Sequence, residues 1–307
     1  MNIGITGATG LIGSAVGQLA ASAGHSVVAY SRSPERARLP WAHELRRIDA
    51  SAPLPLDASG LDCLIHLAGE TILGLWTKAK KDRIRDSRVD LTRRVVRCIA
   101  EASPRPSTFI CASGTGFYGS QGDQWLDESS PLGQDFLASV CRDWEAAARS
   151  VEQLSVRSVQ CRTGLVLSPH GGAFPLMKRA FSFGLGGRLG DGRHYQPWIH
   201  IRDEAGLILF AAENSHISGP INLCAPTPVT NTDFTRLLAK AVSRPAFFHT
   251  PAFVLKTALG GLGEALLCSQ RAQPKVALDN GYTFAFTDLS SAFQDLMSKP
   301  KITSSGT

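Results

Sequence analysis

The feature that most constrains this sequence is a glycine-spaced turn that joins a short apolar run to a helix-like run. Residues 3–5 are apolar and suit one buried strand, and Gly7, Gly10 and Gly13 follow. This spacing suits a sharp turn after a strand, a close approach of backbone N–H groups to a phosphate, and tight packing of the next helix. Because the N-terminus of a helix presents free N–H groups, we expect residues 6–13 to hold the pyrophosphate of a dinucleotide.

A second strand is predicted at residues 26–30, and it completes a strand–helix–strand unit. An NAD-specific unit carries an acidic residue after this strand, where it binds the ribose hydroxyls. This chain has Ser31 and Arg32 at that place. A guanidinium suits a 2′-phosphate, so the sequence favours NADP(H) over NAD. The alternative interpretation is an arginine that only faces solvent in a turn.

Apolar runs and helix-like segments alternate through the first half of the chain. Such alternation predicts an α/β fold with a doubly wound parallel sheet over residues 1–167. Further strands are expected near 45–48 and at 61–67, 108–112 and 156–161, and helices are expected at 13–24, 78–102 and 135–151.

From residue 168 the pattern changes, because a glycine-rich loop at 184–192 and shorter segments replace the regular alternation. We expect residues 168–300 to form a smaller α+β lobe that encloses a substrate, and residues 301–307 to form a tail. One strand near 220–224 is expected to rejoin the sheet. Asp203 is expected to cap a helix that ends at Glu213.

The composition is that of a globular protein, with 43% hydrophobic and 19% charged residues among 307. No apolar run is long enough for a membrane span, so no membrane partner is expected. Since the first strand starts at the beginning of the sequence, we expect no signal peptide and a cytoplasmic location. The seven cysteines form no C-x-x-C pair and no cluster with metal-ligand spacing, which predicts reduced thiols and no metal site.

The net charge of +6 and the many cations of residues 78–97 raise the question of nucleic-acid binding. No aromatic residue is interleaved among those cations, so no stacking platform for bases is present. A solvated basic face is the expected interpretation, and no nucleic-acid partner is expected.

Several motifs together resemble the extended short-chain dehydrogenase/reductase superfamily, and within it an atypical branch of epimerase-family proteins with a DUF1731-like C-terminus. The resemblance covers nearly the whole chain. It implies a Rossmann domain followed by a lobe that is DUF1731-like from about residue 250. The motifs are TGATGLIG (6–13), SRSP (31–34), HLAGE (66–70), ASGTGFYG (112–119), DFLASVCRDWEAAA (135–148), CRTGLVLS (161–168), PWIHIRDEA (197–205) and QRAQPKVALDNGYTF (270–284).

The resemblance implies that NADP(H) lies across the glycine-spaced turn, with Ser31 and Arg32 on the 2′-phosphate. Arg88 would reach the cofactor phosphates, and Val166 would lie near the nicotinamide. Tyr195, Trp198 and His200 would line a substrate pocket. The implied cofactor contacts are Gly7, Thr9, Gly10, Leu11, Ile12, Gly13, Ser31, Arg32, Leu67, Ala68, Gly69, Arg88 and Val166.

The chain departs from the superfamily in its catalytic residues. Active members use a Ser or Thr, a Tyr, and a Lys four residues after the Tyr. Here the Ser/Thr position falls on Gly114, directly after Ser113, and the Tyr and Lys positions fall on Leu137 and Cys141. Neither leucine nor cysteine can perform that proton transfer, so the usual chemistry is in doubt.

Two hypotheses remain open at this stage. The chain is an NADP(H)-dependent oxidoreductase or epimerase of an unidentified small molecule, with Tyr118, Ser113 and His200 as candidates for the proton transfer. Each of the three has an alternative role as a residue that only supports the fold. Otherwise the chain is a non-catalytic NADPH sensor or scaffold, for example in cell-envelope or division processes. A monomer or a homodimer is expected.

Overall fold

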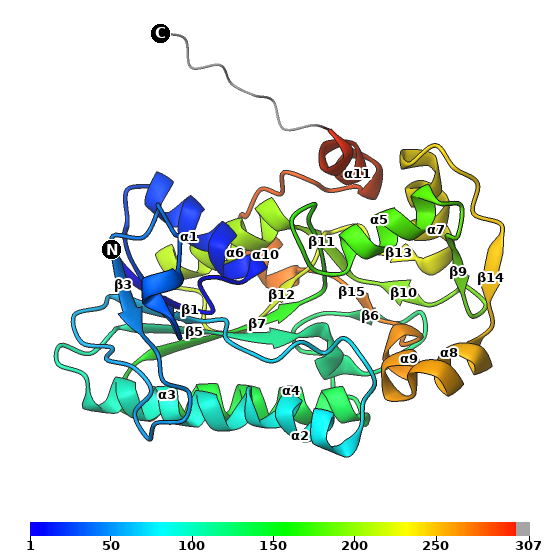
Figure 1. The fold of residues 1–307 in the computed structure, drawn as a ribbon. Helices are drawn as coiled ribbons and strands as arrows, with labels where there is room; N and C mark the ends of the chain where they lie inside the picture. Colours follow the sequence, from blue (N-terminus) through cyan, green and yellow to red (C-terminus); the bar gives the residue numbers. More distant parts are fainter. Residues whose placement is uncertain (299–307) are drawn as a thin grey trace, which may run out of the picture.

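The computed structural model describes residues 1–298, so the tail expected at 301–307 lies outside the described residues. One sheet of seven strands runs in the order β12-β7-β5-β4-β1-β2-β3 (Figure 1), and every neighbouring pair is parallel. The predicted doubly wound parallel sheet is therefore confirmed. Its strands are β1 (Asn2–Thr6), β2 (Ser26–Ser31), β3 (Glu44–Arg47), β4 (Cys63–His66), β5 (Thr108–Gly114), β7 (Arg157–Thr163) and β12 (Gly219–Leu223).

Helices cover both faces of the sheet (Figure 1). One face carries α1 (Leu11–Ser22), α6 (Ile201–Glu213) and α10 (Lys275–Asp279), and the other carries α2 (Lys78–Asp86), α3 (Val89–Glu101) and α4 (Phe136–Arg149). The second half of the sequence thus adds α6, which packs against α1, and β12, which pairs with β7.

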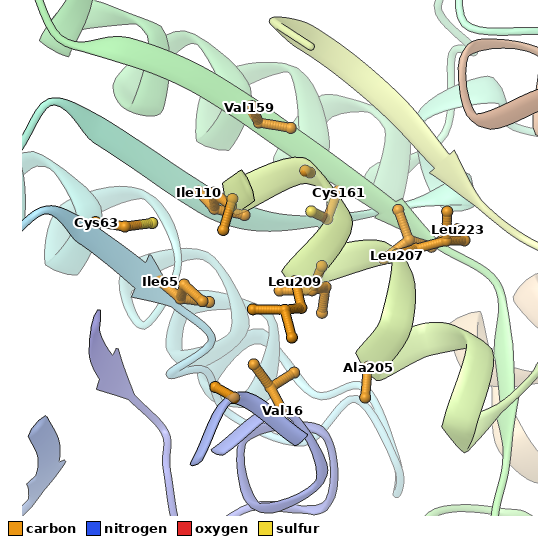
Figure 2. Close-up of a cluster of buried hydrophobic side chains, with 14 of the residues drawn as sticks. Val16, Cys63, Ile65, Ile110, Val159, Cys161, Ala205, Leu207, Leu209 and Leu223 are labelled. Atoms are coloured by element: carbon orange, nitrogen blue, oxygen red, sulfur yellow. The ribbon is translucent and has the colours of Figure 1, made fainter. Parts of the chain in front are cut away.

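The core under α6 shows why the strands read as nearly continuous apolar runs. Figure 2 shows Leu207 and Leu209 of α6 directed toward the sheet, where Ile110 and Cys161 lie. Strands of a parallel sheet with helices on both faces are buried on both sides, so they need apolar residues at successive positions.

Beyond the sheet, the second half of the chain forms a lobe with its own apolar core. Phe293 of α11 (Leu289–Met297) packs against Phe174 of α5 (Phe174–Ser182) and Phe234 of α7 (Asn231–Ala241). Helices α8 (Ala252–Leu259) and α9 (Gly261–Leu266) complete it. Short strands pair as β8 (Leu165–Leu167) with β11 (Trp198–His200), β9 (Gly187–Leu189) with β14 (Phe248–Thr250), β10 (Tyr195–Gln196) with β13 (Val229–Thr230), and β6 (Trp125–Leu126) with β15 (Arg271–Ala272).

Two details of the helices differ from the sequence-based expectation. The helix expected at 78–102 is divided into α2 and α3 at Ser87 and Arg88, and there the Arg88 side chain donates to the carbonyl oxygens of Ile84 and Glu70 at 3.2 and 3.0 Å. The N-cap of α6 is His200 and not Asp203. The Asp203 carboxylate instead accepts hydrogen bonds from the backbone N–H groups of residues 285 and 286.

Across residues 1–298, no helix is both long and apolar enough to cross a bilayer. In the same part of the chain, no three His, Cys, Asp or Glu side chains gather in a way that would hold a metal ion. All seven cysteines are free thiols, and six of them are buried.

Candidate functional site

The glycine-spaced turn lies between β1 and α1. Gly7 has a φ of 70°, a conformation that favours glycine, and its carbonyl oxygen accepts a hydrogen bond from the Gly10 N–H at 2.9 Å. A Cβ on Gly13 would lie only 2.3 Å from the same oxygen, so α1 can approach the turn only with glycine there. The N-cap residue of α1 is Gly10, which has no side chain to cap the helix. The first N–H groups of α1 are therefore available to an anion.

A cavity of about 370 Å³ lies beside this turn, at the carboxyl ends of β1, β2 and β4. Ser31 and Arg32 line it at the end of β2, as the sequence predicts. The carboxylate of Glu70, the one acidic residue in the lining, is paired with Lys80 at 2.7 Å. The lining residues are Gly7, Thr9, Gly10, Tyr30, Ser31, Arg32, Ile48, Ala50, Leu67, Ala68, Gly69, Glu70, Ser87 and Leu91.

A second cavity of about 500 Å³ shares Leu67 and Gly69 with the first, so the two are adjoining parts of one site. Most of its lining is apolar, and Arg88 is the one charged residue among the lining residues. The lining consists of Ile12, Leu67, Gly69, Ile72, Arg88, Ala112, Ser113, Gly114, Thr115, Gly116, Leu137, Cys141, Trp144, Thr163, Gly164, Leu165, Val166, Leu262, Ala265, Leu266 and Gln270.

Most of the predicted cofactor residues are therefore brought together along these two cavities. Leu11 and Gly13 are the two that line neither. Gly13 lies behind the turn, and the side chain of Leu11 is directed toward Gly171 and Gly172.

Arg88 is a half-buried cation at the junction of the two cavities. Its guanidinium lies beside Gly69 and 5.2 Å from the ring of Trp144. Burial lowers the pKa of Arg88. Within residues 1–298, no carboxylate lies within salt-bridge distance of it, so a phosphate would supply the missing counter-charge.

Ser113 lines the second cavity at the end of β5, but its hydroxyl is already engaged. It donates a hydrogen bond to Glu145 Oε1 at 2.8 Å. Glu145 in turn receives two hydrogen bonds from Arg162, at 2.8 and 2.9 Å, and both of these side chains are buried. Ser113 is thus the end of a buried ion-pair network that faces the cavity.

Tyr118 does not lie in either cavity, contrary to the expectation from the sequence. Its side chain is fully buried, donates to Asn222 Oδ1 at 2.6 Å and accepts from Arg162 Nη1 at 3.0 Å. Burial raises the pKa of the Tyr118 phenol. The hydroxyl therefore links β12 to β7 inside the protein.

His200 also lies outside both cavities. Its Nδ1 accepts the N–H of Arg202 as the N-cap of α6, its ring packs 4.0 Å from that of Phe286, and its Nε2 lies 3.2 Å from Asp295 Oδ2. Burial lowers the pKa of His200 to about 4, so the ring is neutral at physiological pH. Tyr195 and Trp198 do not line these two cavities either.

Comparison with known families agrees with this arrangement. Residues 3–224 match the NAD dependent epimerase/dehydratase family, which is more than half of the chain. The chain belongs to this family. Residues 250–296 of this family member match a domain of unknown function (DUF1731).

Individual relatives extend the likeness over the whole chain. The Bacillus subtilis epimerase family protein YfhF is 34% identical over 302 residues, which are 98% of this chain and 99% of the relative. The crystal structure of human epimerase family protein SDR39U1 with NADPH has a TM-score of 0.88 and 32% identity, and the match covers 97% of this chain and 99% of that one. A nucleoside-diphosphate sugar epimerase from Corynebacterium glutamicum has a TM-score of 0.78 and 36% identity, over 96% of this chain and 58% of its own.

In this epimerase-family chain, Leu137 and Cys141 of α4 both line the second cavity. They are the residues that the sequence places at the usual Tyr and Lys positions. Burial raises the pKa of the Cys141 thiol to about 11, so it is neither a base nor a cation at physiological pH. The helical spacing of 137 and 141 on one face is the signal that could have predicted them as lining residues.

Sequence reasoning missed the opposite wall of the second cavity. Leu262, Ala265 and Leu266 of α9 and the following Gln270 form it, together with Thr163 at the end of β7. No local pattern marks α9 as a wall, because its position depends on how the C-terminal lobe packs on the sheet.

Proposed function

We propose that the chain binds NADP(H) and acts as an oxidoreductase on a small molecule held in the second cavity. The proposal rests on the first cavity, which would hold the adenosine and which we call the adenosine end of the site. There Ser31 and Arg32 follow β2, where an NAD-specific protein has an acidic residue. The NADPH of the human relative supports the same choice of cofactor. When bound, the cofactor would supply or accept a hydride.

The residues present fit such a cofactor. The uncapped N-terminus of α1 and the half-buried guanidinium of Arg88 both favour phosphate groups. Ile12 and Val166 form apolar walls in the second cavity, where a nicotinamide would lie. The chain's contribution is to bind, orient and shield the reacting groups from water.

The substrate end favours a small and largely apolar compound. Apart from Arg88, which faces the cofactor phosphates, no cation lines this end of the site. The diphosphate of a nucleotide sugar would therefore lack a counter-charge in the cavity. Since the usual Tyr and Lys are absent, we expect slow reduction of generic carbonyl compounds and of nucleotide sugars, if they react.

A second candidate function is a non-catalytic NADPH sensor or scaffold. Leu137 and Cys141 occupy the catalytic positions, and the Ser113 hydroxyl is engaged by Glu145, which together favour this alternative. The buried free thiols support a reducing compartment such as the cytoplasm for either function.

The test is a titration with NADPH followed by a screen of aldehydes, ketones and nucleotide sugars for NADPH oxidation. Wild type, Tyr118→Phe and His200→Ala are compared, with cofactor affinity measured in each. We expect NADPH binding in all three, and the same turnover in all three because neither residue lines the site. Absence of NADPH binding would overturn the proposal, and binding without any turnover would favour the sensor or scaffold.

A further inference from the structure

Of the three hydroxyl residues that line the second cavity, Ser113 and Thr163 each have a buried carboxyl group behind them. Ser113 and Thr163 come from the paired strands β5 and β7, where Gly114 lies opposite Thr163. Ser113 donates to Glu145 of α4 at 2.8 Å, and Thr163 donates to Glu204 of α6 at 2.8 Å. Since α4 and α6 cover opposite faces of the sheet (Figure 1), the two carboxyl groups approach the cavity from opposite sides.

The two carboxyl groups differ in charge. Glu145 is held by two hydrogen bonds from the Arg162 guanidinium and is the anion of a buried ion pair. Glu204 has no cation within salt-bridge distance in residues 1–298, and its Oε2 is buried without a hydrogen-bond partner. A fully buried carboxyl group in such a place is stable in its neutral, protonated form.

The other ionisable groups that face Glu204 do not change this conclusion. They are the thiols of Cys161 on β7 and Cys224 after β12, and the phenol of Tyr282 after α10. None of them carries a positive charge. Burial raises the pKa of Glu204 to about 8, so most of the protein holds a proton there at neutral pH.

We propose that Thr163 is the catalytic proton donor of this site and that Glu204 is the positioning acid that resupplies it. This inference rests on the proposed function, because it concerns the reduction of a carbonyl group in the second cavity. A protonated Glu204 can donate to Thr163 Oγ1 across the same 2.8 Å contact, which frees the threonine proton to point into the cavity.

The proton path balances with hydride transfer from NADPH. The hydride would leave a C–H bond of NADPH, which becomes NADP⁺, and form a C–H bond with the carbonyl carbon, which is reduced. The electron pair of the C=O π bond moves to the oxygen. That oxygen takes the proton of the Thr163 hydroxyl, and Thr163 takes the proton of Glu204, which is left as a carboxylate. Alcohol oxidation follows the same path in reverse. Thus α6 supplies the proton that Leu137 and Cys141 of α4 cannot supply.

The activity test uses single-turnover oxidation of bound NADPH by benzaldehyde as the carbonyl probe, measured against pH. In wild type we expect a rate that is constant below about pH 8 and falls above it. Glu204→Gln keeps a side chain that can hydrogen-bond to Thr163 but has no proton to give up. It should lower the rate by about 10²-fold or more and remove the dependence on pH. Thr163→Val should lower the rate similarly, and Thr163→Ser should restore it, with NADPH affinity unchanged in all variants.

The matched control is Glu128→Gln. Glu128 is also a buried carboxyl group with a raised pKa, but it accepts hydrogen bonds from the N–H groups of Asn222 and Val276 and lines neither cavity. This control should keep the rate and the pH profile of wild type. If Glu204→Gln also keeps both while wild type oxidises NADPH, the inference is overturned and the proposed function stands. If wild type binds NADPH and reduces no carbonyl compound, the proposed function fails and the inference fails with it.

Infrared spectroscopy gives a readout that needs no turnover. The C=O stretch of a protonated carboxyl group should be present in wild type at neutral pH and lost well above pH 8. The band assigned to Glu204 should be missing in Glu204→Gln and retained in Glu128→Gln. A wild-type spectrum identical to that of Glu204→Gln at neutral pH would show that Glu204 holds no proton and would overturn the inference.

Discussion

Arg32 gives the sharpest prediction at the scale of single residues. It is exposed at the rim of the adenosine end, where only NADP(H) carries a phosphate. A charge-assisted hydrogen bond contributes about 1.5–3 kcal/mol, so Arg32→Ala should weaken NADPH binding by about 10- to 150-fold. NADH binding should change much less. Calorimetric titration with both cofactors measures the difference. The control is Arg36→Ala, because Arg36 is an exposed arginine that does not line the cavity. Equal losses for the two cofactors would contradict the role of Arg32.

The same scale shows where sequence-based prediction succeeds and where it fails. The residues of the turn could be predicted because their roles depend on neighbours within the same strand–turn–helix unit. Tyr118 and His200 could not be judged in that way. The Tyr118 hydroxyl is hydrogen-bonded to Asn222 and the His200 ring lies beside Asp295, both distant in the sequence, so polarity near a motif did not indicate access to the cavity.

At the scale of elements, the ion pair of Glu145 with Arg162 joins α4 to β7. Removing one partner of a buried pair leaves the other charge without compensation, which costs about 3–5 kcal/mol. Glu145→Ala should therefore lower the free energy of unfolding by that amount, as measured by urea denaturation. Asp90→Ala removes the exposed partner of Arg93 and should change it by less than about 1 kcal/mol. A similar small loss in both variants would mean that the buried pair is not a major support of the fold.

The cations of residues 78–97 give the second prediction at this scale. Several of these cations are engaged by the protein, since Lys80 pairs with Glu70, Arg85 with Asp143, and Arg94 donates to carbonyl oxygens of residues 50 and 52. We expect no binding of duplex DNA below micromolar concentration at physiological salt, measured by fluorescence anisotropy. Tight binding that weakens steeply with added salt would indicate several phosphate contacts and would contradict this expectation.

For the whole molecule, Glu204 links stability to pH. Its pKa is about 8 in the folded protein and 4.5 as an ordinary glutamate, so between these values the folded state holds a proton that the unfolded chain releases. The stability contributed by Glu204 therefore decreases as pH rises through this range, by up to about 1.4 kcal/mol per pH unit.

Urea denaturation of wild type and Glu204→Gln at several pH values between 5 and 8 tests this linkage. The free energy of unfolding of wild type should fall relative to that of the variant as pH rises. His66 and His200, whose pKa values are lowered by burial, are present in both proteins and cancel in the difference. A difference that stays constant across the range would show that Glu204 is ionised throughout.

The architecture as a whole was predictable because alternating strands and helices leave few ways to build a sheet. The wall formed by α9 and Gln270 was not, since it depends on contacts between distant parts of the chain, such as the hydrogen bonds of Ser269 with Ser120 and Gln121. Besides the strand expected near 220–224, which is β12, helix α6 also returns to pack on the first part of the chain.

The two ends of the site also differ in when they can form during synthesis. The adenosine end is lined entirely by residues between Gly7 and Leu91, within the first third of the chain. The substrate end also needs Leu262 to Gln270, which leave the ribosome after every strand of the seven-stranded sheet. A nascent chain that has reached Leu91 thus carries every lining residue of the adenosine end. A chain that stops before Leu262 lacks one wall of the second cavity.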